Sequence, residues 1–156
     1  MKVQDIMRRE VRFAGPLTDL ATAGRRMAEI GCGFLPVVGG IESAVVGVVT
    51  DRDIAISLSI ADRKPSEMLV GEVMSRDVHT CSPTQDLRAA LRWMGSRKVR
   101  RLVVIDRQRL VGVLCLDDVA PAARPVWTEN LDGPLFVDVA ETLSAICEHP
   151  APAMRT

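Results

Sequence analysis

The stretch GVVTDRDIA, residues 47–55, returns 65 residues later in the chain as GVLCLDDVA, residues 112–120. Both copies begin with a glycine, continue with apolar residues typical of a strand, and carry an aspartate at the seventh position. The fourth position differs, because the threonine of the first copy is a cysteine in the second. A segment that recurs in this form indicates an internal duplication, and a duplication decides the fold.

The duplication extends well beyond these two stretches. A shift of 67 places aligns residues 3–38 with residues 70–105, and the shift becomes 65 from residue 47 onward. The change falls in the stretch GGIESA, where the second copy has the shorter DRQR, as expected of a turn between two strands. Sixteen of the 45 aligned positions are identical, which is too many for chance at one fixed register. The chain therefore contains one unit twice.

Hydrophobic periodicity predicts the same order of elements in both copies. In the first copy, Thr18 is expected to cap a helix that ends at Gly31, with Leu20, Ala23, Met27 and Ile30 on one face. The predicted elements are a helix over 18–31, strands over 34–38 and 44–50 and a helix over 51–60, then a helix over 85–94, strands over 101–105 and 110–115, and a short helix over 117–120 that stops near Pro121.

These elements predict an α/β (α+β) fold. Each copy has a small sheet and two helices, which is too little to bury a hydrophobic core alone. We therefore expect the two copies to pack on each other as one pseudo-symmetric domain.

Composition argues against several classes of function. The chain has 156 residues with 20 basic and 20 acidic side chains, so its charge favours neither a polyanion nor an anionic membrane as the main partner. No run approaches the roughly 20 apolar residues of a membrane span, and the first ten residues lack the apolar region of a signal peptide. Four cysteines without a CxxC pair and two histidines give little support to a metal site. We expect a soluble cytoplasmic protein with reduced thiols.

The motifs that accompany the duplication resemble those of a known family. VQDIM, FLPVV and GVVTDRDIA in the first copy look like a CBS domain, the module named after cystathionine beta-synthase. VGEVM, VRRLVVID and GVLCLDDVA in the second copy look like another. The resemblance implies a tandem CBS pair, or Bateman module, with repeat 1 over residues 1–60, a linker over 61–69, repeat 2 over 70–122 and a C-terminal extension over 123–156.

The resemblance also implies a regulatory ligand that contains adenosine, such as AMP, ADP, ATP or S-adenosylmethionine, bound in a cleft between the repeats. In the family pattern T-x-x-D, the aspartate holds the ribose hydroxyls and the threonine hydroxyl reaches a phosphate. The matching positions are Thr50 and Asp53. A carboxylate can accept two bonds from a cis-diol, and a hydroxyl can donate to an anionic oxygen. The alternative is structural, because an aspartate in the first turn of a helix also complements the helix dipole.

The second repeat departs from this pattern at Cys115, which aligns with Thr50. A thiol is a poor hydrogen-bond partner, so a phosphate contact is lost there while Asp118 still offers a ribose contact. This repeat also carries Arg100 and Arg101, and VRRLVVID is similar to a stretch in the gamma subunit of AMP-activated kinase whose two corresponding positions contact nucleotide phosphates. We expect the threonine to bind phosphate in one site and the arginine pair in the other.

Other nearby side chains have weaker support. Arg97 and Lys98 are expected only to complement the dipole at a helix end, and His79 is expected to be exposed. The C-terminal stretch 136–149 is predicted as a short helix whose apolar stripe docks on the domain or on a second subunit, and residues 149–156 are expected to be mobile. The remaining expected ligand contacts, for the adenine ring, are Val11, Phe13, Pro36 and Thr80, and the predicted docking stripe is Val139, Leu143 and Ile146.

The best-supported function is a non-catalytic regulatory module that binds an adenosyl ligand and signals to a separate, unknown effector protein. No nucleophile–base motif, phosphate-binding loop or acidic metal cluster supports an enzyme, and neither a cofactor nor a metal is expected. A homodimer is expected because the stretches DIAISLSI and LRAALRWM carry more apolar residues than one helix face needs. The alternatives are a degenerate pair that acts only in dimerisation, and nucleic-acid binding through RKVRR, which is disfavoured by neutral charge and few aromatic residues.

Overall fold

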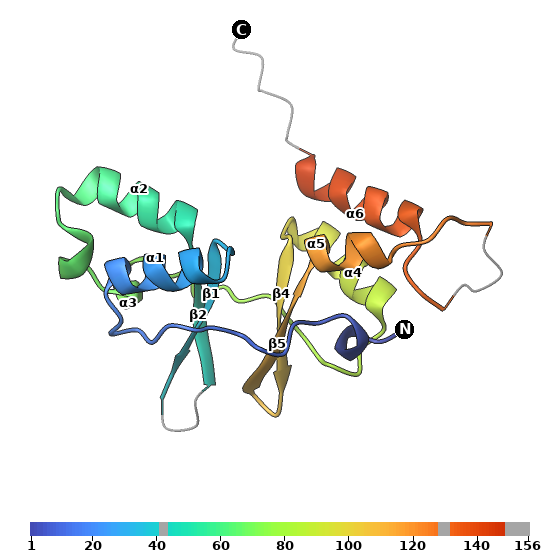
Figure 1. Ribbon diagram of the computed structural model, residues 1–156, viewed down its shortest axis with the longest axis horizontal. Helices are drawn as coiled ribbons and strands as arrows, with labels where there is room; N and C mark the ends of the chain where they lie inside the picture. Colours follow the sequence, from blue (N-terminus) through green and yellow to red (C-terminus); the bar gives the residue numbers. More distant parts are fainter. Residues whose placement is uncertain (41–43, 128–131, 149–156) are drawn as a thin grey trace, which may run out of the picture.

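The computed structural model of this chain describes residues 1–40, 44–127 and 132–148. Two similar halves lie side by side, each with a strand hairpin and helices packed over one end of it (Figure 1). The mixed α/β fold built from two repeated units is therefore confirmed. The elements are α1 Leu20–Glu29, β1 Phe34–Gly39, β2 Ala44–Thr50, α2 Asp51–Ala61, α3 Val70–Val73, β3 Thr80–Cys81, α4 Leu87–Arg97, β4 Arg101–Asp106, β5 Arg109–Cys115, α5 Leu116–Val119 and α6 Phe136–Cys147.

One five-stranded sheet, in the order β1-β2-β5-β4-β3, runs through both halves. Its antiparallel hairpins β1–β2 and β4–β5 are joined through Ala44 opposite Arg109, the residues that begin β2 and β5. Each hairpin has a register shift at the same aligned position, after Val37 in the first and after Val104 in the second. The duplication therefore extends to the irregularities of the backbone. Part of the predicted turn GGIESA, residues 41–43, lies outside the described residues.

The two halves exchange the segments that precede them. The N-terminus lies beside the second half (Figure 1), where Arg8 pairs with Val113 of β5 in an antiparallel bridge. In return, the segment that leads into the second repeat lies on the first half, where Ser75 pairs with Val48 of β2. The same exchange therefore occurs twice, at aligned positions of the two repeats.

The glycine that opens each duplicated stretch is required by this exchange. A Cβ atom on Gly47 would lie 2.8 Å from the carbonyl oxygen of Ser75, and one on Gly112 would lie 2.9 Å from the carbonyl oxygen of Arg8. Side chains do not tolerate a backbone oxygen at that distance, so only glycine lets the exchanged segment lie against the strand.

Hydrophobic burial holds the exchanged segments in place. Val3 and Met7 of the N-terminal segment are buried in the core of the second half. Met68 and Val70, from the segment that leads into the second repeat, are buried in the core of the first half. Full burial of one aliphatic side chain contributes about 1.5–3 kcal/mol, so these four residues tie each half firmly to the segment that it receives.

The start of α1 differs from the prediction, whereas Gly31 follows the end of the helix with a left-handed φ of +58°, as expected. Asp19, not Thr18, caps the helix, because its carboxylate accepts a hydrogen bond from the backbone N–H of Thr22 at 2.8 Å. The Thr18 hydroxyl instead accepts from the N–H of Gly15 at 3.0 Å and closes the preceding turn. Ile30 is exposed, whereas the other three residues of the predicted face are buried.

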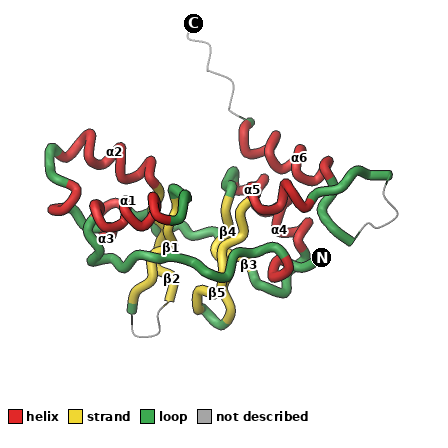
Figure 2. The backbone as a smooth tube through the Cα atoms, viewed as in Figure 1, coloured by secondary structure: helices red, strands yellow, loops and turns green. Residues whose placement is uncertain are grey.

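Helix α6 supplies the long second helix that the second half otherwise lacks. The direct counterpart of α2 is α5, which has four residues and runs into a turn that contains Pro121. The chain then returns, and α6 lies along α4 (Figure 2). The two helices approach closely, since a Cβ on Gly95 would lie 3.2 Å from the Cβ of Ala145. Of the two predicted docking places, α6 therefore occupies the one on its own domain.

The face of α6 that docks is not quite the predicted one. Val139 and Ile146 pack against the core of the second half, as expected. Leu143 is 42% exposed, so its place in the predicted stripe is wrong. The buried position beside it is Thr142, whose hydroxyl donates to the carbonyl of Asp138 at 2.7 Å and therefore costs little to bury. The predicted mobile tail, residues 149–156, lies outside the described residues.

Candidate ligand site

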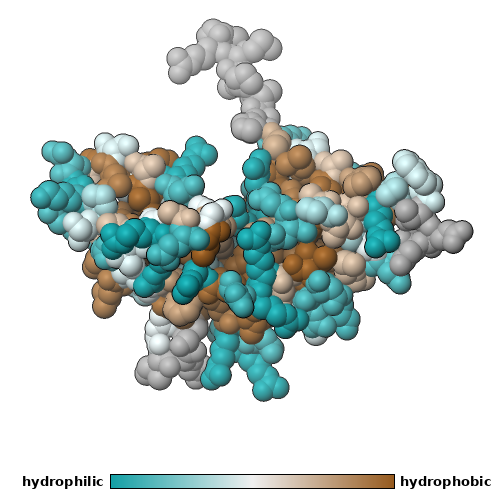
Figure 3. Space-filling view, viewed as in Figure 1, coloured by the Kyte–Doolittle hydropathy of each residue, from teal (hydrophilic) through white to brown (hydrophobic). Residues whose placement is uncertain are grey.

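A cleft of about 570 Å³ opens between the two halves. Figure 3 shows the hollow between the lobe that carries α2 and the lobe that carries α6. Its lining comes from places far apart in the sequence: the junction of β2 and α2, the segment after α3, the end of α4, the start of β4 and the end of α6. The lining residues with chemical groups suited to a polar ligand include Thr50, Asp53, His79, Lys98, Arg100 and Arg101.

Thr50 and Asp53 form the wall of the cleft at the start of α2. The Thr50 hydroxyl accepts from the N–H of Asp53 at 3.2 Å, and the Asp53 carboxylate accepts from the N–H of Thr50 at 2.9 Å. This reciprocal pair is a capping box, so the structural role considered for Asp53 is present. All hydrogen bonds that Asp53 accepts, including one from the Thr50 hydroxyl at 2.7 Å, fall on Oδ2. Within the described residues, Oδ1 therefore keeps its capacity to accept from a ligand.

Arg100 and Arg101 form the facing wall at the start of β4. Arg100 is exposed, whereas the Arg101 side chain is only 26% exposed and its guanidinium lies 5.6 Å from the ring centre of Phe34. The Arg101 Nε is buried and has no hydrogen-bond partner among the described residues. The Asp117 carboxylate lies 4.0 Å from the Arg101 Nη2, which is too long for a hydrogen bond. The partly exposed end of the guanidinium, which lines the cleft, can therefore donate to an anionic ligand.

The structure brings together residues that the sequence assigns to two different sites. Thr50 and Asp53 of the first repeat line the same cleft as Arg100 and Arg101 of the second. The cleft therefore combines carboxylates from the first turn of α2 with cations from the other half. Arg52 of the same turn and Asp77 also line the cleft, so acidic and basic groups are mixed around it and suit a ligand that has both hydroxyl donors and anionic oxygens.

Two lining residues were not expected at the site. The His79 side chain is only 18% exposed, so the expectation that it is solvent-exposed is wrong. Lys98, expected only to complement a helix dipole, also lines the cleft. The signal that could have identified Lys98 is local, because it aligns with Gly31 at a helix end where glycine is the favoured residue.

The expected contacts for the adenine ring are dispersed. Pro36 is buried within β1, and Phe13 is exposed. Thr80 lies on β3 and lines a separate shallow recess beside Trp93. Val11 packs against a buried cluster that includes Cys115. None of these four predicted residues lines the described cleft.

Asp118 is held by an ion pair from the exchanged N-terminal segment. The Nε of Arg8 donates to both carboxylate oxygens of Asp118, at 2.9 and 2.8 Å, and its Nη2 donates to Oδ1. These hydrogen bonds raise the pKa of Arg8, and the Asp118 side chain is only 17% exposed. Ser75 occupies the aligned position in the first half, where it lines the cleft. The two aspartates of the duplicated stretches therefore have different surroundings.

Cys115 is unsuited to nucleophilic or redox chemistry. Its thiol is buried, and burial raises the pKa of Cys115 to about 11. The thiolate, which is the reactive form, is therefore scarce at neutral pH. Cys115 acts as a small apolar residue in the cluster that also contains Phe34, Val103 and Val113.

The described residues form neither a cluster of metal-binding side chains nor a helix that could span a membrane. Within residues 1–40, 44–127 and 132–148, no three His, Cys, Asp or Glu side chains are grouped in a way that could hold a metal ion. Among the same residues, no helix has both the length and the apolar character that a membrane crossing needs.

Comparison with known proteins identifies the duplicated unit. The family model described as CBS domain matches the chain twice, over residues 3–59 and 70–124. The CBS domain-containing protein YhcV of Bacillus subtilis is 32% identical over 118 residues, which are 76% of this chain and 82% of that protein. Hypoxic response protein 1 of Mycobacterium tuberculosis is 32% identical over 117 residues, 75% of this chain and 81% of that protein.

Solved structures show the same arrangement. The crystal structure of Hypoxic Response Protein I with two coordinated zinc ions matches with a TM-score of 0.70 at 30% identity, over 80% of this chain and 100% of that one. In the part of the present chain that the structure describes, no three His, Cys, Asp or Glu side chains are grouped so as to hold such an ion. The crystal structure of CBSX2 in complex with AMP matches with a TM-score of 0.66 at 27% identity, over 78% of this chain and 94% of that one.

Proposed function

The chain belongs to the CBS domain family, and from this premise we propose that it is a non-catalytic regulatory module that binds an adenosine-containing ligand in the cleft between its two repeats. The observation that carries the proposal is the composition of that cleft, in which the Asp53 carboxylate faces the Arg100–Arg101 pair across the two halves. CBSX2, a protein of the same fold, is described in complex with AMP, which supports the choice of ligand class.

In the proposed complex, each part of the ligand meets a matching group. The ribose hydroxyls donate to Oδ1 of Asp53, and the phosphates accept from Arg100, Arg101 and the Thr50 hydroxyl. The adenine ring packs on the apolar part of the lining, which is formed by Phe34, Val48 and Val103.

Pseudo-symmetry extends the proposal to the other predicted contacts. Pro36 aligns with Val103, which lines the described cleft. By the same symmetry, a second ligand position would lie at the other side of the domain and would be lined by Val11, Phe13, Cys115 and Asp118. Thr80 is the counterpart of Phe13 in the second repeat. The ion pair between Asp118 and Arg8 makes this second position the weaker candidate for a ribose contact, so we place the principal ligand in the described cleft.

A regulatory role agrees with what the described residues offer chemically. Burial raises the pKa of the Cys115 thiol to about 11, so its reactive thiolate form is scarce at neutral pH. We propose that the module acts in the cytoplasm and transmits ligand binding to a separate effector protein.

Equilibrium titration tests the ligand proposal. Calorimetry with AMP, ADP, ATP and S-adenosylmethionine is expected to give a dissociation constant between micromolar and millimolar for at least one of them, which corresponds to roughly 4–8 kcal/mol. An absence of heat with all four ligands would favour a module that acts only in dimerisation. Binding of single-stranded nucleic acid that weakens steeply with salt would instead favour a nucleic-acid-binding protein.

We further propose a homodimer whose interface includes α2. On α4, Leu87, Leu91 and Met94 are buried, whereas α2 in the first half keeps an uncovered apolar face. Ile60 on α2 is 79% exposed, Ile56 is also exposed, and hydrophobic side chains are visible over this helix in Figure 3.

Ile60→Asp is expected to convert this dimer into a monomer. A two-fold interface contains each residue twice, and each buried isoleucine contributes about 1.5–3 kcal/mol. Light scattering at micromolar concentration measures the change. Leu17→Asp, at another exposed apolar residue that lies outside α2, is the matched control and should leave the dimer intact. A wild-type protein that is monomeric at this concentration would count against the proposal.

A further inference from the structure

Lys98 adopts a backbone conformation that glycine would adopt more easily. Its φ is +55°, in the left-handed region, immediately after α4. The aligned residue after α1 is Gly31, with φ +58°. Both helices end in the same way, because the N–H of the next residue, Cys32 or Val99, donates to the carbonyl five residues earlier, at 3.0 Å in each case. The second repeat therefore has a lysine at a left-handed position where the first repeat has glycine, the residue that this conformation favours.

A residue that is retained against its backbone preference points to a role for its side chain. The side chain of Lys98 lines the ligand cleft. Its ammonium also donates to the carbonyl oxygen of Glu148 at 2.6 Å, at the residue that caps the end of α6. Ile146, two residues before Glu148, lines the same cleft. Lys98 thus touches the proposed binding site and the helix that closes one side of it.

Helix α6 is held along its whole length. Thr142 is buried near its middle, and Ala145 in its last turn approaches Gly95 of α4 closely. At the start, Asp138 forms an ion pair with Arg88 at 3.0 Å. At the C-terminal end, Ile146 packs against the core of the second half, and the hydrogen bond from Lys98 to Glu148 joins this end to the cleft. A change at the Lys98 ammonium therefore bears directly on how firmly this end is docked.

We propose that Lys98 senses the charge of the bound ligand and couples it to α6, an inference that rests on the proposed function of the cleft. An ammonium group has three donors, so Lys98 can hold a ligand phosphate and the Glu148 carbonyl together. The docked helix supplies Ile146 to the cleft wall and keeps Lys98 in place, so the docked state binds an anionic ligand more tightly than the undocked one. By linkage, the ligand must then stabilise the docked state, and more strongly as its phosphate charge increases.

Hydrogen exchange of the full-length protein tests this coupling. Saturating ATP is expected to slow amide exchange at the C-terminal end of α6 by about tenfold, and AMP by less. In Lys98→Gly, which suits the left-handed backbone, the fold should be retained, while the response of α6 to ATP disappears and the affinity for ATP relative to AMP falls. Lys98→Arg is expected to restore both properties in part. Arg97→Ala is the matched control, because Arg97 stacks 4.2 Å from the ring centre of Trp93 and does not line the cleft.

The possible outcomes separate this inference from the proposed function. If calorimetry shows ATP binding but α6 exchanges equally fast with and without it, the coupling is wrong and the ligand site stands. If Lys98→Gly speeds the exchange of α6 equally in both conditions and leaves the preference for ATP unchanged, Lys98 is only a tether. If no nucleotide binds, the proposed function fails and the coupling fails with it.

Discussion

Asp53→Ala is expected to weaken the binding of both AMP and ATP by about 10- to 150-fold, because a hydrogen bond to a charged group contributes about 1.5–3 kcal/mol. Arg101→Ala is expected to cause a loss of the same size for ATP and a smaller one for AMP, since the interaction grows with phosphate charge. Both side chains line one cleft, so both substitutions act on the same binding event. Calorimetry should show a raised dissociation constant with an unchanged number of ligands per chain.

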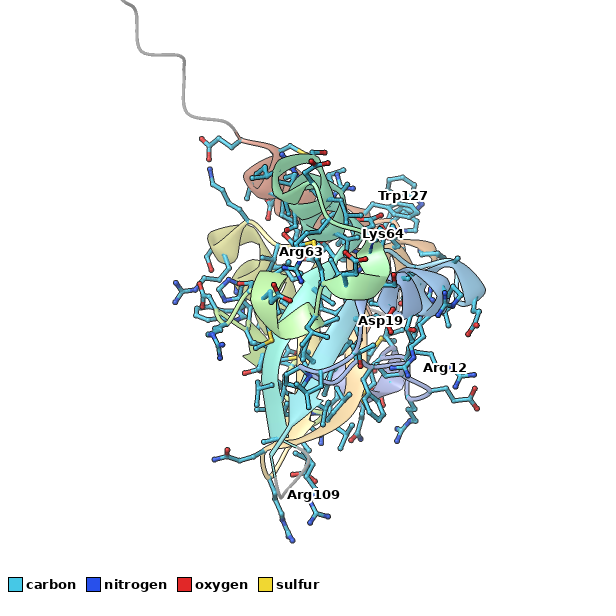
Figure 4. The ribbon with its side chains drawn as sticks, turned by 90° about the vertical axis from the view of Figure 1, so that its left-hand side faces the viewer. Arg12, Asp19, Arg63, Lys64, Arg109 and Trp127 are labelled. Carbon is cyan, nitrogen blue, oxygen red and sulfur yellow. The ribbon has the colours of Figure 1, made fainter. Side chains whose placement is uncertain are left out.

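Two control variants separate binding from folding. Asp53 is part of a helix cap, so its loss also destabilises α2. Asp19→Ala removes the equivalent cap of α1, which costs about 1 kcal/mol of stability, but Asp19 does not line the cleft and nucleotide binding should persist. Arg109→Ala removes an arginine at the tip of the β4–β5 hairpin, at the far end of the sheet from α2 (Figure 4), and should leave binding unchanged.

A different binding pattern would indicate that each repeat has its own independent ligand site. In that case Asp53→Ala would abolish part of the binding and leave the remaining ligand at its original dissociation constant, and Arg101→Ala would remove only the other part. Such a pattern is the one expected when each repeat forms its own site, and it would show that the shared cleft does not hold a single ligand.

Gly47→Ala and Gly112→Ala are each expected to lower the free energy of unfolding by about 1–3 kcal/mol, the usual cost of forcing atoms into a packed site. The new methyl group would meet a backbone oxygen, of Ser75 at 2.8 Å or of Arg8 at 2.9 Å. A backbone segment cannot rotate away as a side-chain end can, so the exchanged segment must shift. Urea unfolding followed by circular dichroism measures the loss.

Gly24→Ala provides the control with the opposite sign. Gly24 lies inside α1, and a Cβ there would have no atom within 4 Å. Alanine is favoured over glycine in a helix, so this substitution should raise stability by about 0.5–1 kcal/mol. If Gly47→Ala and Gly112→Ala also left stability unchanged or raised it, the exchange of segments would not be as tight as the geometry indicates.

The sequence by itself determines the repeated unit and its elements. The pattern GVVT followed by DRDIA predicts a strand that passes directly into a helix, and the structure has β2 ending at Thr50 and α2 beginning at Asp51. Such a prediction succeeds because strand and helix periodicity depend on residues close in sequence. It fails where neighbours compete: Thr18 and Asp19 can both cap a helix, and the turn that uses Thr18 leaves the cap to Asp19.

Only the tertiary structure shows that α6 covers α4. Both the domain and a second subunit were possible docking places for the C-terminal helix, because an amphipathic stripe does not identify what covers it. The burial of Thr142 against α4 also could not be predicted from the sequence. Threonine is a polar residue, and only the structure shows that its hydroxyl donates to the Asp138 carbonyl in its own helix.

The candidate site shows the same division. The sequence identifies Thr50, Asp53, Arg100 and Arg101 as residues suited to a nucleotide, but alignment of the repeats assigns them to separate sites. Only the packing of the two halves places them around one cleft, because a cleft between repeats takes each wall from a different part of the chain. The exchange of segments likewise decides that Asp118 meets Arg8 while the cleft beside Asp53 receives Ser75. The sequence therefore determines which residues can bind a ligand, whereas the tertiary structure determines which of them face one another, because those contacts join residues far apart in the chain.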